Sequence, residues 1–379
     1  MKVSDVQNPS RAPFAVCTII WKNYLAHART LAQSVRTQHP DVPFIVLLAD
    51  HVDGYFDAAR EEFEMVEIEQ LDVPDLRRFC FQYSPLALNT AVKPWFLAYL
   101  LGQRGFRKVM YFDADIMVLD ALTEVADVLD RAPIALTPHL TAPATDADTI
   151  ECVERPMLLF GAYNLGFIGV ARSETTDRFL AWWQARLWRH CVFAPERGLF
   201  VDQRWIDLVP GMFDAVRVLR DPSYNVARWN LHHRTVVMRD DRVLVDGHPC
   251  RFFHFSGFDP RNGEVAPNNG FYTFERLGGA AALYRRYADL LYRNGFAETI
   301  GWPQAFSVFD NGEPIPDEAR LRYLAMGDAV ARFGDPFATA PESSFYRTWR
   351  AREAGLRGLA RRLRRSAAWA AGRIHARLT

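Results

Sequence analysis

Several features that often identify a class of protein are scarce or missing in this sequence. The five cysteines are scattered and none forms a Cys-X-X-Cys pair, so neither a disulfide framework nor a zinc knuckle is predicted. The formal net charge is zero, which argues against nucleic-acid binding driven by bulk charge. No run of about 18 apolar residues occurs, so we expect no membrane-spanning helix. The first residues lack the apolar stretch of a signal peptide, and the expected location is the cytoplasm.

What the sequence does contain is a regular alternation of apolar runs and helix-like segments. Hydrophobic residues make up 49% of the chain, which is ample for a large core. The alternation predicts a doubly wound α/β fold, in which helices flank a sheet. We expect strands at 14–20, 43–50, 64–68, 108–112, 133–137 and 163–170, and helices at 23–38, 85–101, 120–129, 174–190, 280–298 and 317–333.

Two aspartates stand inside an apolar run, VMYFDADIMVL, at residues 109–119. In an extended segment the side chains of Asp113 and Asp115 share a face, and ligands of doubly wound sheets bind at the carboxyl ends of strands. Two carboxylates suit Mg²⁺ or Mn²⁺ held jointly by the protein and by substrate phosphates. The alternative is that the aspartates cap a turn or pair with Arg107 or Lys108.

Residues 89–125, which include this pair, resemble the core of GT-A fold (Rossmann-like) glycosyltransferases, and among them the glycogenin-like enzymes of glycosyltransferase family 8. The resemblance implies a mixed, mostly parallel sheet flanked by helices. In that family an Asp-X-Asp motif binds Mn²⁺ together with the diphosphate of a nucleotide-sugar donor. The resemblance implies that Asp113, Ala114 and Asp115 form this motif and that Lys93 contacts the donor. Without the resemblance, Lys93 would be interpreted as a lysine on a helix surface.

Two later segments follow in the order expected for the family. YNLGFIGV (163–170) resembles the strand in which an asparagine contacts the donor sugar, which implies roles for Asn164 and Gly166. The alternative is a close backbone approach that requires Gly166. FVDQRWI (200–206) resembles the Asp-Gln segment near the transferred sugar, which implicates Asp202 and Gln203. Asp202 could instead cap a short helix.

A third segment, FFHFSGFDP (252–260), resembles the family's His-X-X-Gly motif, in which the histidine is the third metal ligand. His254 and Gly257 match this motif, and a histidine beside two carboxylates suits Mn²⁺ better than Mg²⁺. A buried core histidine is the alternative. The lysine that usually follows the motif is missing, and Arg261 or Arg228 could bind phosphate in its place.

The family also places the nucleobase against residues at and after the first strand. The corresponding residues here are Thr18, Asn23 and Tyr24, although Tyr24 could equally serve helix packing.

The expected organisation is a catalytic domain at 1–275, a helical C-terminal extension at 276–345 and a basic amphipathic helix at 346–379. From Arg347 onward the chain has ten arginines and one acidic residue. A basic amphipathic helix suits an anionic membrane surface. A helix packed on the body, or a solvated tail, would show the same pattern.

The resulting hypothesis is a metal-dependent glycosyltransferase of bacterial surface polysaccharide synthesis. It would move a sugar from a nucleoside-diphosphate donor, UDP-linked by resemblance, to a glycan or lipid-linked acceptor with retention of configuration. An inactive GT-A-like protein that binds sugars or partners remains an alternative. A sugar-nucleotide pyrophosphorylase is disfavoured because WKNYLAHART (21–30) is not a glycine-rich loop.

Overall fold

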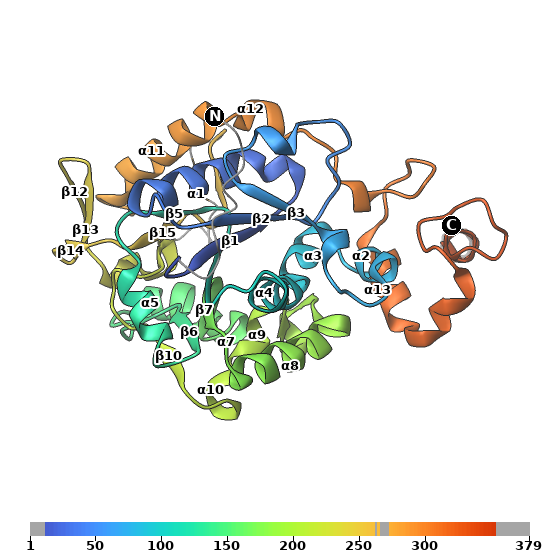
Figure 1. The fold of residues 1–379 in the computed structure, drawn as a ribbon, viewed down its shortest axis with the longest axis horizontal. Helices are drawn as coiled ribbons and strands as arrows, with labels where there is room; N and C mark the ends of the chain where they lie inside the picture. Colours follow the sequence, from blue (N-terminus) through green and yellow to red (C-terminus); the bar gives the residue numbers. More distant parts are fainter. Residues whose placement is uncertain (1–11, 262–263, 266–272, 354–379) are drawn as a thin grey trace, which may run out of the picture. The chain divides into compact units, whose positions relative to one another are not determined.

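The computed structural model describes residues 12–261, 264–265 and 273–353 (Figure 1). The chain divides into two compact units. Of the described residues, those in 12–74 and 85–305 form the first unit, and those in 75–84 and 306–353 form the second.

A seven-stranded sheet forms the centre of the first unit, with strand order β10-β6-β7-β4-β1-β2-β3. Only β7 runs antiparallel to its neighbours, which confirms the predicted mixed, mostly parallel sheet. The strands are β1 (Ala15–Ile20), β2 (Phe44–Leu48), β3 (Glu64–Glu67), β4 (Lys108–Phe112), β6 (Ile134–Pro138), β7 (Tyr163–Ala171) and β10 (Val216–Val218).

Helices cover both faces of this sheet. Strands β1 and β2 are buried along their whole length, which explains why they are continuous apolar runs rather than alternating ones. Figure 1 shows α1 on one side of the sheet and α4 and α8 on the other. The helices of the first unit are α1 (Leu25–Gln38), α3 (Pro85–Ala91), α4 (Lys93–Gly102), α5 (Thr123–Leu129), α6 (Ala147–Thr149), α7 (Arg155–Phe160), α8 (Glu174–His190), α9 (Gln203–Ile206), α10 (Val209–Met212), α11 (Ala280–Arg293) and α12 (Phe296–Thr299).

The single helix predicted at 85–101 is divided at Val92 into α3 and α4. Pro94 lies in the first turn of α4. Because proline has no backbone N–H, it cannot continue the hydrogen bonding of a preceding helix, but it fits the start of a new one.

A small second sheet joins distant parts of the chain. It has the order β11-β15-β5, formed by Val226–Ala227, Phe252–His254 and Ile116–Val118. Strand β15 is antiparallel to β5 and places His254 opposite Ile116. The Phe252 ring fixes this sheet to the central one, since its centroid lies 5.1 Å from those of Phe112 and Phe167.

The boundary predicted at residue 275 differs from the division seen in the structure. Helix α11 buries an apolar face that contains Leu283, Tyr284 and Tyr287. The Tyr287 ring stacks on Phe255 at 3.8 Å, directly after β15. The first unit therefore extends to residue 305, because α11 completes a core that the strands begin.

The second unit is helical and includes α2 (Leu76–Gln82) and α13 (Asp317–Ala325). Its buried Arg320 donates hydrogen bonds to the carbonyl oxygens of Phe81 and Tyr83, both at 2.7 Å. Of the basic helix predicted at 346–379, residues 354–379 lie outside the described residues. Within the described ranges, the structure has no helix that is both long and apolar enough to cross a membrane.

The Phe252 contacts predict a large cost for Phe252→Ala. We expect the variant to lose about 3–5 kcal/mol of unfolding free energy, because a large cavity would open between the two sheets. Phe193→Ala is the matched control, since Phe193 is 65% exposed and its loss should change stability by about 0.5 kcal/mol or less. Urea denaturation followed by fluorescence measures both, and equal costs would contradict the role of Phe252.

Candidate metal and donor site

The two aspartates lie in the turn between β4 and β5. Strand β4 ends at Phe112, as predicted, so the carboxylates follow the carboxyl end of the strand, and both are partly exposed. The turn is closed by a hydrogen bond from the Ile116 N–H to the Asp113 carbonyl, at 3.1 Å. Lys108 does not pair with either aspartate but with Asp130, at 2.6 Å.

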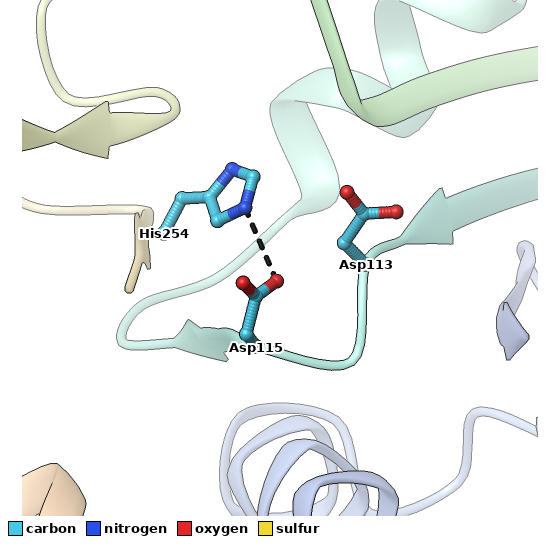
Figure 2. A group of neighbouring side chains, drawn as sticks. All are labelled: Asp113, Asp115 and His254. Atoms are coloured by element: carbon cyan, nitrogen blue, oxygen red, sulfur yellow. Dashed lines mark ion pairs between the residues drawn. The ribbon is translucent and has the colours of Figure 1, made fainter. Parts of the chain in front are cut away.

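His254 reaches the aspartates because β15 pairs with β5. The ladder continues past the strand ends, with the Phe255 N–H donating to the Asp115 carbonyl at 2.9 Å. One ligand atom each from Asp113, Asp115 and His254 lie within 4.8 Å of one another. Figure 2 shows the three side chains converging, and His254 Nε2 lies 3.1 Å from Asp115 Oδ1.

The charges of this group depend on one another. Burial alone would lower the pKa of His254, but the adjacent Asp115 carboxylate raises it above its ordinary value. Burial likewise opposes ionisation of Asp115, yet His254 holds the pKa of Asp115 below its ordinary value. The geometry therefore favours a carboxylate beside a cation.

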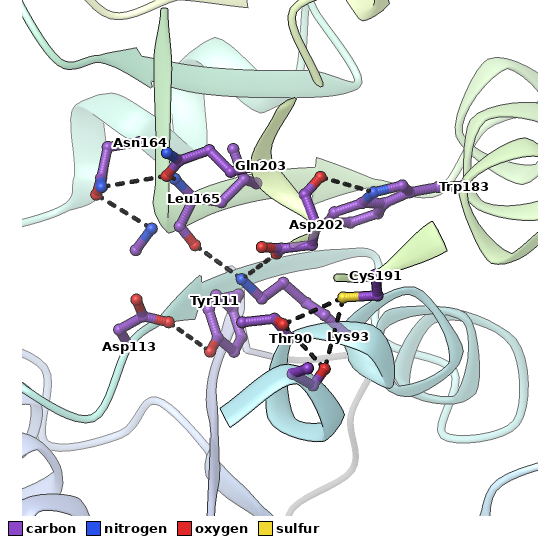
Figure 3. A network of polar contacts seen from close by, with 12 residues as sticks. Thr90, Lys93, Tyr111, Asp113, Asn164, Leu165, Trp183, Cys191, Asp202 and Gln203 are labelled. Atoms are coloured by element: carbon purple, nitrogen blue, oxygen red, sulfur yellow. Dashed lines mark hydrogen bonds and ion pairs between the residues drawn. The ribbon is translucent and has the colours of Figure 1, made fainter. Parts of the chain in front are cut away.

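A buried ion pair lies on the far side of Tyr111 from Asp113 (Figure 3). Lys93 donates to Asp202 Oδ2 at 2.7 Å and to the Leu165 carbonyl at 2.9 Å, and neither charged residue is exposed by more than 2%. Burial raises the pKa of Asp202, and Lys93 only partly opposes this. Asp202 occupies the N-cap position of α9, but its side chain makes no capping hydrogen bond.

Tyr111 connects this ion pair to the metal-ligand group. Its hydroxyl donates to Asp113 Oδ1 at 2.6 Å, and Lys93 Nζ lies 4.3 Å from its ring centroid. Burial, together with the Asp113 carboxylate, raises the pKa of Tyr111 well above its ordinary value. The hydroxyl therefore stays protonated and orients Asp113.

Asn164 and Gln203 are hydrogen-bonded to each other rather than open to solvent (Figure 3). Gln203 Oε1 accepts from the Leu165 N–H at 3.0 Å and from Asn164 Nδ2 at 3.3 Å. Gln203 Nε2 donates to the Phe160 carbonyl at 2.8 Å. These bonds fix the orientation of the Gln203 amide.

Gly166 lies directly behind His254. A Cβ atom at this position would come within 2.5 Å of His254 Cε1 and 2.6 Å of His254 Nδ1. Strand β7 is also tied to the aspartate turn, because the Asp113 N–H donates to the Gly166 carbonyl at 2.8 Å. Only glycine leaves room for the imidazole ring here.

Three of the remaining predicted residues, Tyr24, Arg261 and Gly257, belong to segments near the metal-ligand group. Tyr24 is close to the group, since burial and then the charges of Asp115 and Asp259 raise its pKa to about 12. The positive charge of Arg261 also acts on Tyr24 and lowers its pKa, although the Arg261 guanidinium is bound to Asp259 at 2.6 Å. Gly257 has a φ of +71° in the turn after β15, a conformation that favours glycine.

Thr18 and Asn23 are less closely connected to the group. Thr18 is completely buried within β1, and Asn23 lies in a short 3₁₀ turn, η1 (Lys22–Tyr24). Among the described residues, neither Thr18 Oγ1 nor Asn23 Oδ1 has a hydrogen-bond partner in the metal-ligand group.

Other polar residues of the site were not predicted. Tyr111 could have been found, because it precedes Asp113 by two residues and so shares its face of the chain. Asn225 donates to Asn164 Oδ1 at 3.0 Å from a backbone with φ +48°, and nothing in its sequence context indicates this. Arg228, by contrast, was predicted as a phosphate-binding residue. It lies close enough to His254 for its charge to oppose protonation of the imidazole, and its Nε donates to the Ser256 carbonyl at 3.1 Å.

These contacts fit a divalent metal ion. Two carboxylate oxygens and an imidazole nitrogen converge. Two of these side chains also have a hydrogen-bond partner behind them, Tyr111 for Asp113 and Asn164 for His254. Such outer contacts are the usual support of metal ligands. The group could therefore hold a metal ion, with Asp113, Asp115 and His254 as its ligands.

The space behind His254 predicts that Gly166→Ala will displace the imidazole. We expect a loss of about 1–3 kcal/mol in unfolding free energy, since the added methyl overlaps the ring. Gly169→Ala on the same strand is the control, because its nearest approach would be 3.2 Å, to Leu129 Cδ1, so it crowds its neighbours less and leaves His254 untouched. Urea denaturation and a change in the His254 NMR signals measure the effect; undisturbed His254 signals in Gly166→Ala would contradict it.

The buried ion pair predicts a pH-dependent cost for Lys93→Met. At neutral pH we expect a loss of about 3–5 kcal/mol, because Asp202 would be left as an uncompensated buried charge. The pKa of folded Asp202 would then lie still further above its unfolded value, so the cost should shrink as the pH falls and the carboxylate takes up a proton.

The control for this variant is Lys108→Met, since its partner Asp130 is exposed and such pairs contribute about 1 kcal/mol or less. Denaturation midpoints at several pH values would compare the two variants. A cost for Lys93→Met that did not change with pH would contradict the predicted charge on Asp202.

Comparison with known proteins gives distant relatives. No protein-family model matches the sequence. The chain is 27% identical over 256 residues to the uncharacterized protein YfnF of Bacillus subtilis (strain 168), a match that covers 64% of this chain and 81% of YfnF. It is 24% identical over 255 residues to the uncharacterized protein YfnD of the same organism, covering 65% of this chain and 78% of YfnD.

The solved structures that match part of this chain include three glycosyltransferases. The galactosyltransferase LgtC, in complex with donor and acceptor sugar analogs, matches with a TM-score of 0.42 and 16% identity over 74% of this chain and 95% of LgtC. GlyE of Streptococcus pneumoniae TIGR4 matches with 0.43 and 14% identity, over 78% and 67% of the two chains. The bifunctional WbbM matches with 0.40 and 14% identity, over 72% and 51%. Every TM-score is below 0.5, so these likenesses carry no argument for the function of this protein.

Proposed function

We propose that this protein is a metal-dependent glycosyltransferase that uses a nucleoside-diphosphate sugar as donor. The observation that carries the proposal is the convergence of Asp113, Asp115 and His254 within 4.8 Å at the carboxyl end of β4. Ligands of open α/β sheets bind at this edge. Two carboxylates and one imidazole favour Mn²⁺ over Mg²⁺.

The diphosphate of the donor would bind beside these ligands. When bound, the metal ion supplies Lewis-acid stabilisation of the charge on the leaving nucleoside diphosphate. Arg228, whose charge acts on His254, is the residue we propose in place of the missing lysine, because a guanidinium matches phosphate oxygens well. Arg261 is a weaker candidate, since Asp259 already binds it.

The nucleotide end of the donor would lie toward the end of β1. Tyr24 is the best-supported contact there, because it lies close to Asp115 and offers an aromatic face. Asn23 adjoins it in η1, and Thr18 would support this edge from within the strand. Gly257 would allow the turn after β15 to approach the donor closely.

The sugar end would lie toward α9. Asp202 is buried against Lys93, so it would position the sugar through the surrounding network rather than act as a strong base. Gln203 begins the same helix, and its amide is bound to β7. This arrangement suits a retaining transfer through an oxocarbenium-like transition state better than one that needs a general base at Asp202.

The acceptor we propose is a glycan or a lipid-linked sugar of bacterial surface polysaccharide synthesis, with a UDP-sugar as donor. The proposed location is cytoplasmic, at the inner face of the membrane. The support for membrane contact is the arginine-rich sequence of residues 346–379, most of which lies outside the described residues.

The proposal predicts stabilisation by a sugar nucleotide that requires the metal. In a thermal-shift panel of sugar nucleotides, one donor should raise the melting temperature with Mn²⁺ and not without it. A ligand at about 100 times its Kd adds roughly 2.7 kcal/mol. Asp115→Asn should abolish the Mn²⁺-dependent part, because the variant loses a charged oxygen ligand.

Asp120→Asn is the matched control, since Asp120 is a partly exposed aspartate that pairs with Arg251 just beyond β5. It should keep the full stabilisation. Equal Mn²⁺-dependent stabilisation of the wild type and Asp115→Asn would refute the metal site, and a panel with no stabilising sugar nucleotide would refute the donor class.

A further inference from the structure

A second buried ion pair lies at the ends of β1 and β2, the first two strands of the chain. These strands are parallel neighbours, so their carboxyl ends meet at one edge of the central sheet. Lys22 follows β1 and Asp50 follows β2. Lys22 Nζ lies 3.3 Å from Asp50 Oδ1, and both side chains are 1% exposed. Because burying two charges is costly, the geometry that the pair imposes explains it better than added stability does.

The Asp50 carboxylate accepts hydrogen bonds from three parts of the chain. Its Oδ2 accepts from the backbone N–H of Lys22 at 3.2 Å. Its Oδ1 accepts from the backbone N–H groups of His51 at 2.9 Å and Ala305 at 2.8 Å. Lys22 is the first residue of η1, so this turn is bound to Asp50 through both the backbone and the side chain of that residue.

The ammonium group of Lys22 uses all of its donors within the protein. Besides Asp50, it donates to the His51 carbonyl at 3.0 Å and to Asp53 Oδ2 at 2.6 Å. An ammonium group has three N–H donors, and each of them has an acceptor here. Lys22 is therefore an anchor for η1, and it has no donor left with which to bind a phosphate.

The residues on either side of Lys22 have polar atoms without partners. Among the described residues, Trp21 Nε1 and Asn23 Oδ1 are buried and make no hydrogen bond, and the same holds for Thr18 Oγ1 in β1. A buried polar atom without a partner is costly, so a group of them around one turn fits a place that a bound molecule completes. The turn η1 thus combines an anchored lysine with neighbours that a ligand could satisfy.

We infer that Lys22 and Asp50 are positioning residues, which act as one unit to hold η1 in place for the nucleoside part of the donor. The inference rests on the proposed function, which puts the nucleotide at the end of β1. Neither Lys22 nor Asp50 would contact the donor. They would set the position of Asn23 and Tyr24, whereas the diphosphate would bind at the metal-ligand group and would not depend on η1.

The test uses the full-length chain and compares its affinity for two ligands by isothermal titration calorimetry with Mn²⁺ present. One ligand is UDP, replaced by ADP, GDP or CDP if one of these binds the wild type more tightly. The other is inorganic pyrophosphate, which lacks the nucleoside. The variants are Lys22→Met, Asp50→Asn and the double variant, and urea denaturation shows which of them are folded under the conditions of the titration.

We expect each single variant to bind the nucleoside diphosphate on the order of 10-fold more weakly, within the range found for neighbouring groups that act together. Pyrophosphate affinity should stay unchanged, because that ligand does not reach η1. Since either single change already breaks the pair, the double variant should lose no more affinity than the more affected single variant.

Glu61→Gln is the matched control. Glu61 is 7% exposed and pairs with Arg29 of α1 at 2.6 Å, so this variant also removes the carboxylate of a buried ion pair, but away from η1. It should lose stability and keep both affinities. Asp53→Asn is a milder variant that serves if Asp50→Asn does not fold, because it removes the 46% exposed partner of the same lysine. It should show a smaller loss, for the nucleoside diphosphate alone.

Three results in folded variants would overturn the inference. They are an unchanged affinity for the nucleoside diphosphate, an equal loss for both ligands, and additive losses in the double variant. A wild type that binds none of the nucleoside diphosphates would refute the proposed function, and the inference with it, before any variant is compared.

Discussion

The pairing of β15 with β5 is the interaction on which the candidate site depends. The aspartates come from a turn at the edge of the central sheet, whereas His254 comes from a segment much later in the sequence. Only three residue pairs join the two strands, yet their register places His254 opposite Ile116, next to Asp115. Because side chains alternate along a strand, a slip of one residue would turn the imidazole away from the carboxylates.

The polar groups behind the site act together with this pairing. Buried charges and amides are costly unless each has a partner, and a network with every member satisfied holds one arrangement of its side chains. Here the chain of contacts runs from Asp202 through Lys93 and Tyr111 to Asp113. A separate set runs from Gln203 through Asn164 to His254. Asp113 and His254, two of the three proposed ligands, are thus held in place by buried polar groups, and the proposed donor would bind on their other side.

Much of the fold and of the candidate site could be predicted from the sequence, because the strands and the motifs are each visible in short segments of the chain. Apolar runs such as FIVLL (44–48) predicted the strands, and the order of the Asp-X-Asp, Asp-Gln and His-X-X-Gly segments predicted which residues come together. The parts that could not be predicted depend on contacts between distant residues. Nothing near Asn164 indicates that its oxygen meets His254, and nothing near residues 75–84 indicates that this segment belongs with residues after 305.

The stacking of Tyr287 on Phe255 has a practical consequence for where this protein can be shortened. The sequence motifs end near residue 261, so from the sequence alone a truncation shortly after this residue would be expected to leave the candidate site intact. However, Phe253 and Phe255 flank His254 and share a core with α11, including Tyr284 and Tyr287. Removing that helix would expose several aromatic rings to water beside a proposed metal ligand. A chain truncated directly after the last motif would lack α11. It would therefore lose part of the packing that holds His254 in place.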